Sequence, residues 1–386
     1  MLDNVPWEGI HALPMRIGID ARLLGYRRAG IGKYTRRLIE HLAELDQQDK
    51  FIILHSRKDP DTLVEQPNFH RRTLITPSHH RLEQWLLPLE TAFLGLDLLH
   101  SPDFIPPFRR NYKSVITVHD LAFLRFPHFV TAESAHHYGL IDQAVRRTDH
   151  IIAVSESTRA DLVNMLGADE RKVTVIHEAA DPMFRPIEDE AKIRAVREKY
   201  SLADRPYIFF LSTIEPRKNL ATLLRAFRIL LDEYPNVNGV KLAIAGEEGW
   251  LFHEVYSLYH ELHLEPHASF LGRVPQTDLP ALFNGATMHV HPSFYEGFGL
   301  TPLEAMACGT PTVVSNVSSL PEVVGDAGLL VPPDEVEEWT AAMYRLLNES
   351  ELRRVLSEKG LRRAAKFSWE EAARQHLEVY HRFRNH

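Results

Sequence analysis

Cysteine is almost absent from this sequence, and its scarcity excludes an internal disulfide. The 386 residues contain one cysteine, Cys308, which we expect to be a small core residue. The sequence also lacks any apolar run of the ~20 residues that a membrane-spanning helix needs. Residues 1–14 lack the basic start and apolar centre of a secretory signal, so we expect a loose leader there. These absences favour a cytoplasmic protein, either free or at the cytoplasmic face of the membrane.

An excess of positive charge is missing as well. The formal net charge is −8, whereas a dedicated nucleic-acid binder usually carries a basic face and a high isoelectric point. We therefore expect no nucleic-acid partner. The apolar fraction of 44% and the charged fraction of 25% are those of an ordinary globular protein. A chain of this length suits two domains of roughly 150 to 200 residues each.

Short apolar runs alternate with amphipathic segments, which predicts parallel sheets covered by helices on both faces. In a first domain over 15–186, the expected strands are 16–19, 51–55, 97–100, 114–119, 151–154 and 173–177. A charged segment over 186–206 should hold a connecting helix. In a second domain over 187–367, the expected strands are 207–212, 241–245, 268–271, 288–291, 312–315 and 328–331. Two such α/β domains in series imply a cleft, with ligands where the strands end.

The stretch most informative about chemistry is HPSFYEGFGLTPLEAMACGTP, residues 291–311. Its glycine loop, which can bring backbone amides close to an anionic ligand at the start of a helix, consists of Gly297, Phe298, Gly299 and Leu300. Two carboxylates, Glu296 and Glu304, bracket the loop and could accept hydrogen bonds from sugar hydroxyls. This combination indicates a nucleotide-sugar site. Thr301 and Glu304 also fit a capping box, in which Glu304 would only close the helix terminus.

Two strand ends in the first domain carry further candidates. In the segment DARLLGYRRAGIGKY, Gly30 and Gly32 precede a helix and could approach a phosphate or a sugar, although a flexible loop is the commoner reason for such glycines. His119 ends the strand in VITVHDL, where an α/β sheet presents its ligands, and Asp120 could orient its ring. Most of the 22 histidines will be surface or core groups, so position is the argument for His119.

A third strand end, TIEPRKNL, places two cations before a helix. Arg217 and Lys218 could direct positive charge at a diphosphate, and Asn219 could cap the helix that follows. An exposed basic turn is the alternative interpretation of this pair.

These ordered blocks resemble the retaining glycosyltransferases of family 4. Glu296 and Glu304 match the E-x7-E signature of that family within EGFGLTPLEAMACGTP, and EPRKN and the HD pair match two further blocks. The resemblance implies the GT-B fold, in which two Rossmann-like domains face a cleft and a last helix, here over 368–386, crosses back to the first domain. Ser368 and Glu371 form a capping box at the start of that helix.

The resemblance also implies roles for individual residues. Arg217 and Lys218 would clamp the diphosphate of a nucleotide-sugar donor, His119 and Glu296 would hold or activate its sugar, and Glu304 would bind its ribose hydroxyls. The other implied donor contacts are Gly30, Gly32, Arg273, Val274, Gly297, Phe298, Gly299 and Leu300. One departure is Glu178 in VIHEAAD, which stands where the family commonly has asparagine and leaves the role of that position open.

The implied activity is transfer of a hexosyl group from a nucleotide-diphosphate sugar to an acceptor hydroxyl, with retention at the anomeric carbon. HDLAFLRFP resembles family members that use mannose donors, so GDP-mannose is the first candidate. The acceptor could be a glycan, a lipid-linked glycan or a small molecule. Alternatives are a non-catalytic nucleotide-sugar sensor, a phosphorylase or an epimerase.

We expect no metal and no cofactor besides the donor substrate, because cationic side chains and amides can serve the diphosphate. The literal D-x-D sequence Asp59-Pro60-Asp61 is more typical of a turn.

Trp85, Leu86 and Leu87 allow two interpretations. They could make a weak peripheral contact with a membrane surface or a lipid-linked acceptor, although apolar residues at helical spacing more often lie in a core.

Overall fold

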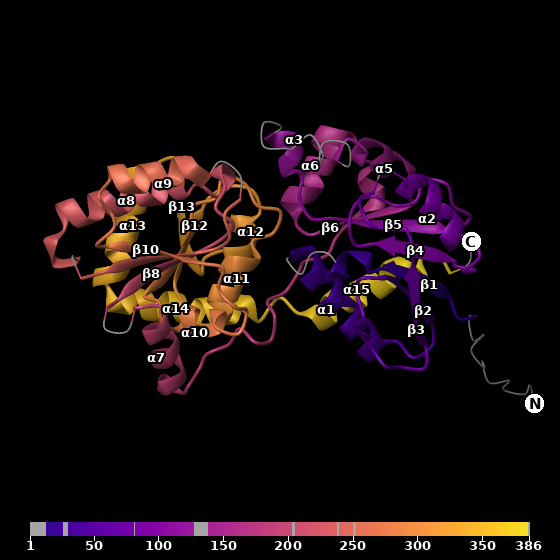
Figure 1. Cartoon of the computed structure of the whole chain (residues 1–386), viewed down its shortest axis with the longest axis horizontal. Coiled ribbons are helices and arrows are strands. Elements are labelled where there is room, and N and C mark those ends of the chain that lie inside the picture. Colours follow the sequence, from indigo (N-terminus) through magenta and orange to yellow (C-terminus); the bar gives the residue numbers. More distant parts are fainter. Residues whose placement is uncertain are drawn as a thin grey trace, which may run out of the picture.

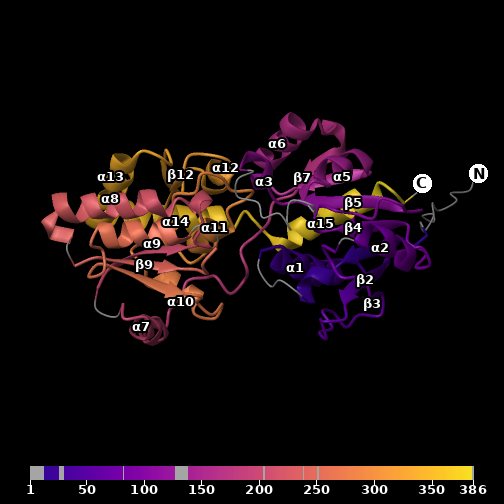
Figure 2. The ribbon, with the colours of Figure 1, turned by 45° about the horizontal axis from the view of Figure 1, so that its top comes forward.

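The computed structural model describes residues 13–25, 30–80, 82–126, 138–202, 205–237, 239–249 and 252–384. Two parallel sheets lie in two neighbouring domains, and helices cover both faces of each sheet (Figures 1 and 2). This arrangement confirms the predicted doubly wound α/β architecture. In the described part of the chain, no helix combines the length and the apolar character needed to cross a membrane.

The first domain contains a seven-stranded parallel sheet in the order β3-β2-β1-β4-β5-β6-β7. Its strands are β1 (Arg16–Asp20), β2 (Lys50–Ser56), β3 (Phe69–Leu74), β4 (Leu98–Ser101), β5 (Lys113–Val118), β6 (His150–Ala153) and β7 (Val173–Val175). Its helices are η1 (Arg22–Gly25), α1 (Gly30–Leu45), α2 (Glu83–Thr91), α3 (Ala122–Arg125), α5 (Ile141–Arg147), α6 (Glu156–Leu166) and η3 (Glu170–Lys172). The inner strands are almost wholly buried because helices cover both faces, which explains their continuous apolar runs.

The second domain contains a six-stranded parallel sheet in the order β10-β9-β8-β11-β12-β13. Its strands are β8 (Tyr207–Leu211), β9 (Lys241–Ala245), β10 (Ala268–Gly272), β11 (Met288–His291), β12 (Thr312–Ser315) and β13 (Gly328–Val331). Its helices are α7 (Glu190–Lys199), η4 (Pro216–Lys218), α8 (Leu220–Glu233), η5 (Pro235–Val237), α9 (Phe252–Glu261), α10 (Leu279–Gly285), α11 (Leu300–Ala307), α12 (Leu320–Val324), α13 (Val336–Asn348) and α14 (Ser350–Ala364). Cys308 is buried in the core of this domain, as expected.

The last helix, α15 (Trp369–His381), returns to the first domain and lies beside α1 (Figure 1). The Ser368 side chain accepts a hydrogen bond from the backbone amide of Glu371, which confirms the Ser368 half of the predicted capping box. Trp369 and Tyr380 belong to the same apolar core as the first strands. The Tyr34 hydroxyl lies 2.7 Å from Nε2 of the buried His376, so a polar contact also joins α1 to α15. The predicted crossing of the C-terminal helix is therefore confirmed.

Two features of the first domain differ from the prediction. β3 was not expected, because at the edge of the sheet its sequence FHRRTL exposes several polar side chains and shows no apolar run. The core interpretation of the helix around Trp85 was wrong for most of its apolar residues. Trp85 is 61% exposed and Leu86 39%, whereas Leu87 is buried. The helix turns its Glu83 side inward, where that carboxylate pairs with the buried Arg22.

Candidate active site

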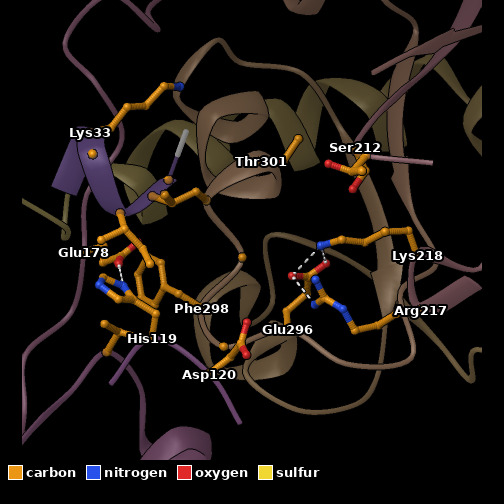
Figure 3. Close-up of a pocket in the computed structure, with 18 of the residues that line it drawn as sticks. Lys33, His119, Asp120, Glu178, Ser212, Arg217, Lys218, Glu296, Phe298 and Thr301 are labelled. Atoms are coloured by element: carbon orange, nitrogen blue, oxygen red, sulfur yellow. Dashed lines mark hydrogen bonds and ion pairs between the residues drawn. The ribbon is translucent and has the colours of Figure 1, made fainter. Parts of the chain in front are cut away.

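A cleft of about 510 Å³ lies between the domains and takes its lining from both. The first domain contributes the start of α1 and the segment after β5, and the second contributes the segment after β8 and the loop that leads from β11 into α11 (Figure 3). These are the carboxyl ends of parallel strands, where α/β sheets bind ligands. The predicted site residues that line the cleft are Gly30, Gly32, His119, Arg217, Lys218, Glu296, Gly297, Phe298, Gly299, Leu300 and Glu304.

Two cations and a carboxylate form one cluster on the second-domain wall. The Lys218 ammonium lies 2.7 Å and 2.9 Å from the two carboxylate oxygens of Glu296, and Nη1 of Arg217 lies 3.5 Å from Oε2 (Figure 3). His291 approaches the same carboxylate at 2.7 Å. The pair Arg217 and Lys218 is therefore a buried, anchored cluster, which excludes the alternative of an exposed basic turn.

Burial and charge act against each other in this cluster. Burial would raise the pKa of Glu296, but the charge of Lys218 and the hydrogen bond from His291 hold it well below its usual range. Burial lowers the pKa of Lys218, and Glu296 opposes that effect without cancelling it. Burial also disfavours the charge on Arg217, yet the carboxylates around it raise its pKa. A second anion arriving here would meet two cations that are already desolvated and fixed in place.

The glycine loop packs directly against the first domain. A Cβ added to Gly297 would lie 1.8 Å from the backbone oxygen of His119, so only glycine fits at this approach. The Ser155 hydroxyl donates a hydrogen bond of 2.6 Å to the Gly297 carbonyl. Gly299 has a φ of 112°, in the region that favours glycine, and precedes the first residue of α11. The predicted need for glycine at these two positions thus has two different causes.

Glu304 faces the cleft from α11. This helix begins at Leu300 with Gly299 as its N-cap and has no side-chain capping bond, so the capping-box interpretation of Thr301 and Glu304 is wrong. Oε1 of Glu304 instead lies 3.5 Å from the ammonium of Lys33 in α1, across the cleft. Burial raises the pKa of Glu304 to about 7, although Lys33 opposes the shift. Glu304 can therefore change its charge near neutral pH.

Both ring nitrogens of His119 face acceptors. Nδ1 lies 2.9 Å from Oε1 of Glu178, and Nε2 lies 2.9 Å from the Pro102 carbonyl oxygen. Both nitrogens can donate only when the ring is protonated. Burial would lower the pKa of His119, but the hydrogen bond and charge of Glu178 raise it above its ordinary value. The geometry and the pKa therefore both favour an imidazolium at the first-domain wall of the cleft.

The partners of His119 and Asn219 correct two predictions. The Asp120 carboxylate accepts a hydrogen bond from the Ala122 amide, so Glu178 and Pro102, and not Asp120, orient the His119 ring. Asn219 does not cap α8, because its own backbone is left-handed and its side chain donates to the carbonyls of Pro292 and Pro333. Asn219 instead ties together two loops of the second domain.

Two predicted donor contacts do not line the cleft. The Arg273 side chain is 80% exposed and pairs with Glu247 at 3.1 Å, and Val274 packs against the apolar core of the second domain. Sequence reasoning missed Lys33 and left Glu178 open, although both line the cleft. Lys33 directly follows the Gly30 and Gly32 pair, and Glu178 is the departure from the family pattern, so both had a signal in the sequence.

In the part of the chain that the structure describes, the side chains grouped closely enough to hold a metal ion lie outside the cleft. The group with suitable side chains there is Asp46, Asp49 and His381, and Asp49 already binds Arg384 at 2.7 Å and the Met15 amide at 2.8 Å. In the D-x-D sequence, Asp59 accepts hydrogen bonds from the side chain of His55 and the amide of Asp61, and so serves its own turn.

Comparisons with known proteins agree with this geometry. The family model described as Glycosyltransferase Family 4 matches residues 28–184, and the one described as Glycosyl transferases group 1 matches residues 192–363. O-antigen chain mannosyltransferase B of Escherichia coli is 31% identical over 95% of this chain and 99% of its own length. Serotype-specific mannosyltransferase WbdA of Escherichia coli is 33% identical over 73% of this chain, a match that spans 35% of that longer protein.

Solved structures show the same fold. Sucrose-phosphate synthase from Thermosynechococcus elongatus aligns with a TM-score of 0.76 at 23% identity, over 95% of this chain and 98% of its own. The Anabaena protein HepE in complex with UDP and glucose aligns with a TM-score of 0.74 at 19% identity, over 95% of this chain and 99% of its own. At these identities, the likeness concerns the fold alone.

Proposed function

This chain belongs to glycosyltransferase family 4 and has the GT-B fold, and we propose that it transfers a mannosyl group from GDP-mannose to a hydroxyl of a glycan acceptor, with retention at the anomeric carbon. The observation that carries the proposal is the cluster of Arg217, Lys218 and Glu296 beside the glycine loop, because it offers fixed positive charge to a diphosphate. The choice of mannose is supported by the similarity to mannosyltransferase B over nearly the whole chain.

In the proposed complex, the diphosphate of the donor lies between the glycine loop and the two cations. Arg217 can offer a planar fork and Lys218 a point charge, and both are now held by Glu296. A diphosphate would take over part of that pairing and free Glu296 to accept hydrogen bonds from sugar hydroxyls. Glu304, on the same wall, would accept from the ribose hydroxyls of the nucleoside.

The reaction separates charge at this position. The bond from the anomeric carbon to the phosphate oxygen breaks, the bond to the acceptor oxygen forms, and the acceptor proton moves to the departing diphosphate. Arg217, Lys218 and the amides of the glycine loop would stabilise the negative charge that develops on the leaving group. Because they are already oriented, they need little rearrangement during the reaction.

Retention by double displacement would require a carboxylate nucleophile next to the anomeric carbon. Two carboxylates of the cleft are engaged elsewhere, Asp120 with the Ala122 amide and Glu178 with His119, and Glu296 would bind the sugar hydroxyls. We therefore propose that the acceptor attacks from the face that the diphosphate leaves. The imidazolium of His119 would lie beside the sugar and help to orient its hydroxyls.

We also propose that this transfer needs no divalent metal, because two cationic side chains occupy the place where a metal would neutralise the diphosphate. Turnover should then persist after the protein has been treated with EDTA and dialysed. A rate that EDTA abolishes and Mg²⁺ or Mn²⁺ restores would contradict this part of the proposal.

The test is a donor screen with the purified chain. GDP-, UDP- and ADP-sugars are compared for thermal stabilisation and for release of nucleoside diphosphate with a mannose-containing oligosaccharide as acceptor. We expect GDP-mannose to be favoured and its turnover to be lost in Glu304→Ala but not in Glu351→Ala, which removes an exposed carboxylate from α14. The anomeric configuration of the product, read by proton NMR, tests retention.

Other outcomes of this screen would favour the alternatives. Binding of the donor without turnover on any acceptor would favour a nucleotide-sugar sensor. Turnover that requires orthophosphate would indicate a phosphorylase, and isomerisation of the sugar without an acceptor would indicate an epimerase.

A further inference from the structure

Helix α2 presents its apolar side to solvent. Its inward stripe consists of Glu83, Leu87 and Thr91, all buried, although two of these side chains are polar. The outward stripe follows positions i, i+3, i+4, i+7 and i+11 and consists of Leu82, Trp85, Leu86, Leu89 and Phe93. A surface helix normally places its apolar stripe toward the core and its polar residues outside. The reversal here leaves large apolar side chains exposed to solvent.

These side chains form one surface, which we call the α2 face: Ile75, Leu82, Trp85, Leu86, Leu89 and Phe93. It holds six of the ten large apolar side chains that are exposed in the described part of the chain. Ile75 joins the helical stripe because its amide donates a 2.7 Å hydrogen bond to Glu90 of α2. Scattered exposed apolar residues are ordinary, but a concentration of this kind marks an interaction surface.

The charged side chains on and beside the α2 face favour an anionic partner over a cationic one. The two acidic residues of the helix are turned away or occupied, because Glu83 pairs with Arg22 and Glu90 accepts from the amides of Ile75 and Thr76. The guanidinium of Arg109 lies 5.1 Å from the ring centre of Trp85. The charged group that the structure places against the exposed aromatic side chain is therefore a cation.

We propose that the α2 face docks the protein onto a bilayer surface that contains anionic phospholipid. A tryptophan beside a guanidinium suits the boundary between headgroups and acyl chains, while the aliphatic side chains enter the apolar layer. A second protein chain fits less well, since stable protein interfaces use about 20–30 residues a side and this surface is one short helix with Ile75. Binding of this kind lies on the membrane and does not cross it.

The position of α2 connects this surface with the cleft. Figure 1 shows α2 on the side of the first domain remote from the second domain, so a docked bilayer would leave the second domain free. The segment before α2 leads back to the active site, where His79, three residues before Leu82, lines the cleft. A further step, which rests on the proposed function, is that the acceptor is attached to a lipid and reaches the cleft along this segment.

The experiment is flotation of the full chain with vesicles. The protein is mixed with vesicles of equal parts phosphatidylcholine and phosphatidylglycerol, or of phosphatidylcholine alone, and the fraction that floats in a sucrose gradient gives a partition coefficient. We expect binding to the anionic vesicles, and a loss of at least about tenfold when Trp85, Leu89 and Phe93 are all changed to serine. The matched control changes Met165 and Leu330, two exposed apolar residues elsewhere, to serine.

The charge contribution is tested separately. Arg109→Gln should lower binding to the anionic vesicles by about fivefold and leave binding to phosphatidylcholine unchanged. Release of GDP from GDP-mannose with a water-soluble acceptor, measured without vesicles, should be the same in the triple variant and the unchanged protein. The two assays can therefore contradict the proposed membrane binding and the proposed donor reaction separately.

Three results would overturn the proposal: no flotation of the unchanged protein, equal flotation of the triple variant, or a dimer seen by sedimentation that the triple variant abolishes. The last result would assign the α2 face to a second copy of the chain.

Discussion

Glu322 of the second domain reaches His177 of the first, with Oε1 of the carboxylate 2.7 Å from Nε2 of the ring. The same carboxylate accepts hydrogen bonds from the amides of Glu156 and Ser157 at the start of α6. Hydrogen bonds to the carboxylate stabilise its charged form, and together they outweigh burial and lower the pKa of Glu322. Glu322 therefore bonds the second domain to two segments of the first, the one at His177 and the start of α6.

Glu322→Ala should weaken this contact between the domains. We expect the radius of gyration, measured by small-angle scattering, to increase, and the KM for the donor to rise about tenfold, because a charged hydrogen-bonding partner is lost. Glu322→Gln keeps the shape of the side chain and one acceptor oxygen. Its radius of gyration and its KM should therefore lie between those of the unchanged protein and of Glu322→Ala. An unchanged scattering curve for Glu322→Ala would show that other contacts are sufficient to hold the domains.

Lys218→Ala should reduce kcat by about 100-fold or more, since it removes a preorganised cation from the proposed diphosphate site. It also leaves Glu296 buried without its main partner, so thermal stability should fall. The double variant Lys218→Ala with Glu296→Gln separates the two effects. We expect it to regain stability without regaining the rate; recovery of both would mean that Lys218 serves only to neutralise Glu296.

Donor binding should depend on the ionisation of Glu304. Its pKa in the free protein is raised to about 7, so the carboxylate that we propose to accept from the ribose hydroxyls is the major form only above that pH. The dissociation constant for GDP should therefore increase about eightfold as the pH falls from 7.5 to 6. Titration calorimetry at several pH values tests this, with Glu304→Gln as a control in which the dependence should disappear.

The same shift has a consequence for stability. Because the pKa of Glu304 is raised on folding, the folded state binds the extra proton, and stability decreases as the pH rises from the ordinary carboxyl pKa toward 7. Glu304→Gln should accordingly raise the melting temperature at pH 8 and have little effect at pH 4. Lys33→Ala should raise the pKa of Glu304 further, because Lys33 is the cation that opposes the shift.

Glu178→Gln should lower the pKa of His119. The glutamine still offers an oxygen to Nδ1 but no negative charge, and the charge of Glu178 is one reason why the imidazolium persists in a buried position. Titration of the ring nitrogens by NMR should show the midpoint moving to lower pH than in the unchanged protein. A midpoint that does not move would mean that the Pro102 carbonyl alone fixes the protonated ring.

The sequence predicted the parts of the fold that depend on local pattern. The expected strands of the second sheet, for example 241–245 and 288–291, coincide with β9 and β11 because buried parallel strands read as continuous apolar runs. β3 and the orientation of α2 depend on what packs against them. Edge position hides β3 from an apolar pattern, and the buried partner Arg22 turns Glu83 inward.

In the site, too, local sequence predicted some features, and others depend on contacts between distant segments. Motif positions such as Arg217 and Glu296 could be assigned to one site through the family resemblance, and the structure adds that both follow neighbouring strands, β8 and β11. Their pairing, and the contact of Lys33 with Glu304, arises only when distant segments meet. The role of Glu178 could not be predicted from the sequence, because a carboxylate at the usual asparagine position does not indicate that it will face the ring of His119.

The return of α15 to the first domain means that the chain passes between the domains twice, once before α7 and once after α14 (Figure 1). The second domain is therefore tethered at both of its ends. Any opening of the cleft would have to bend both connections, which limits how far the second domain could move away from the first. A cut in either connection would still leave the two domains covalently joined through the other.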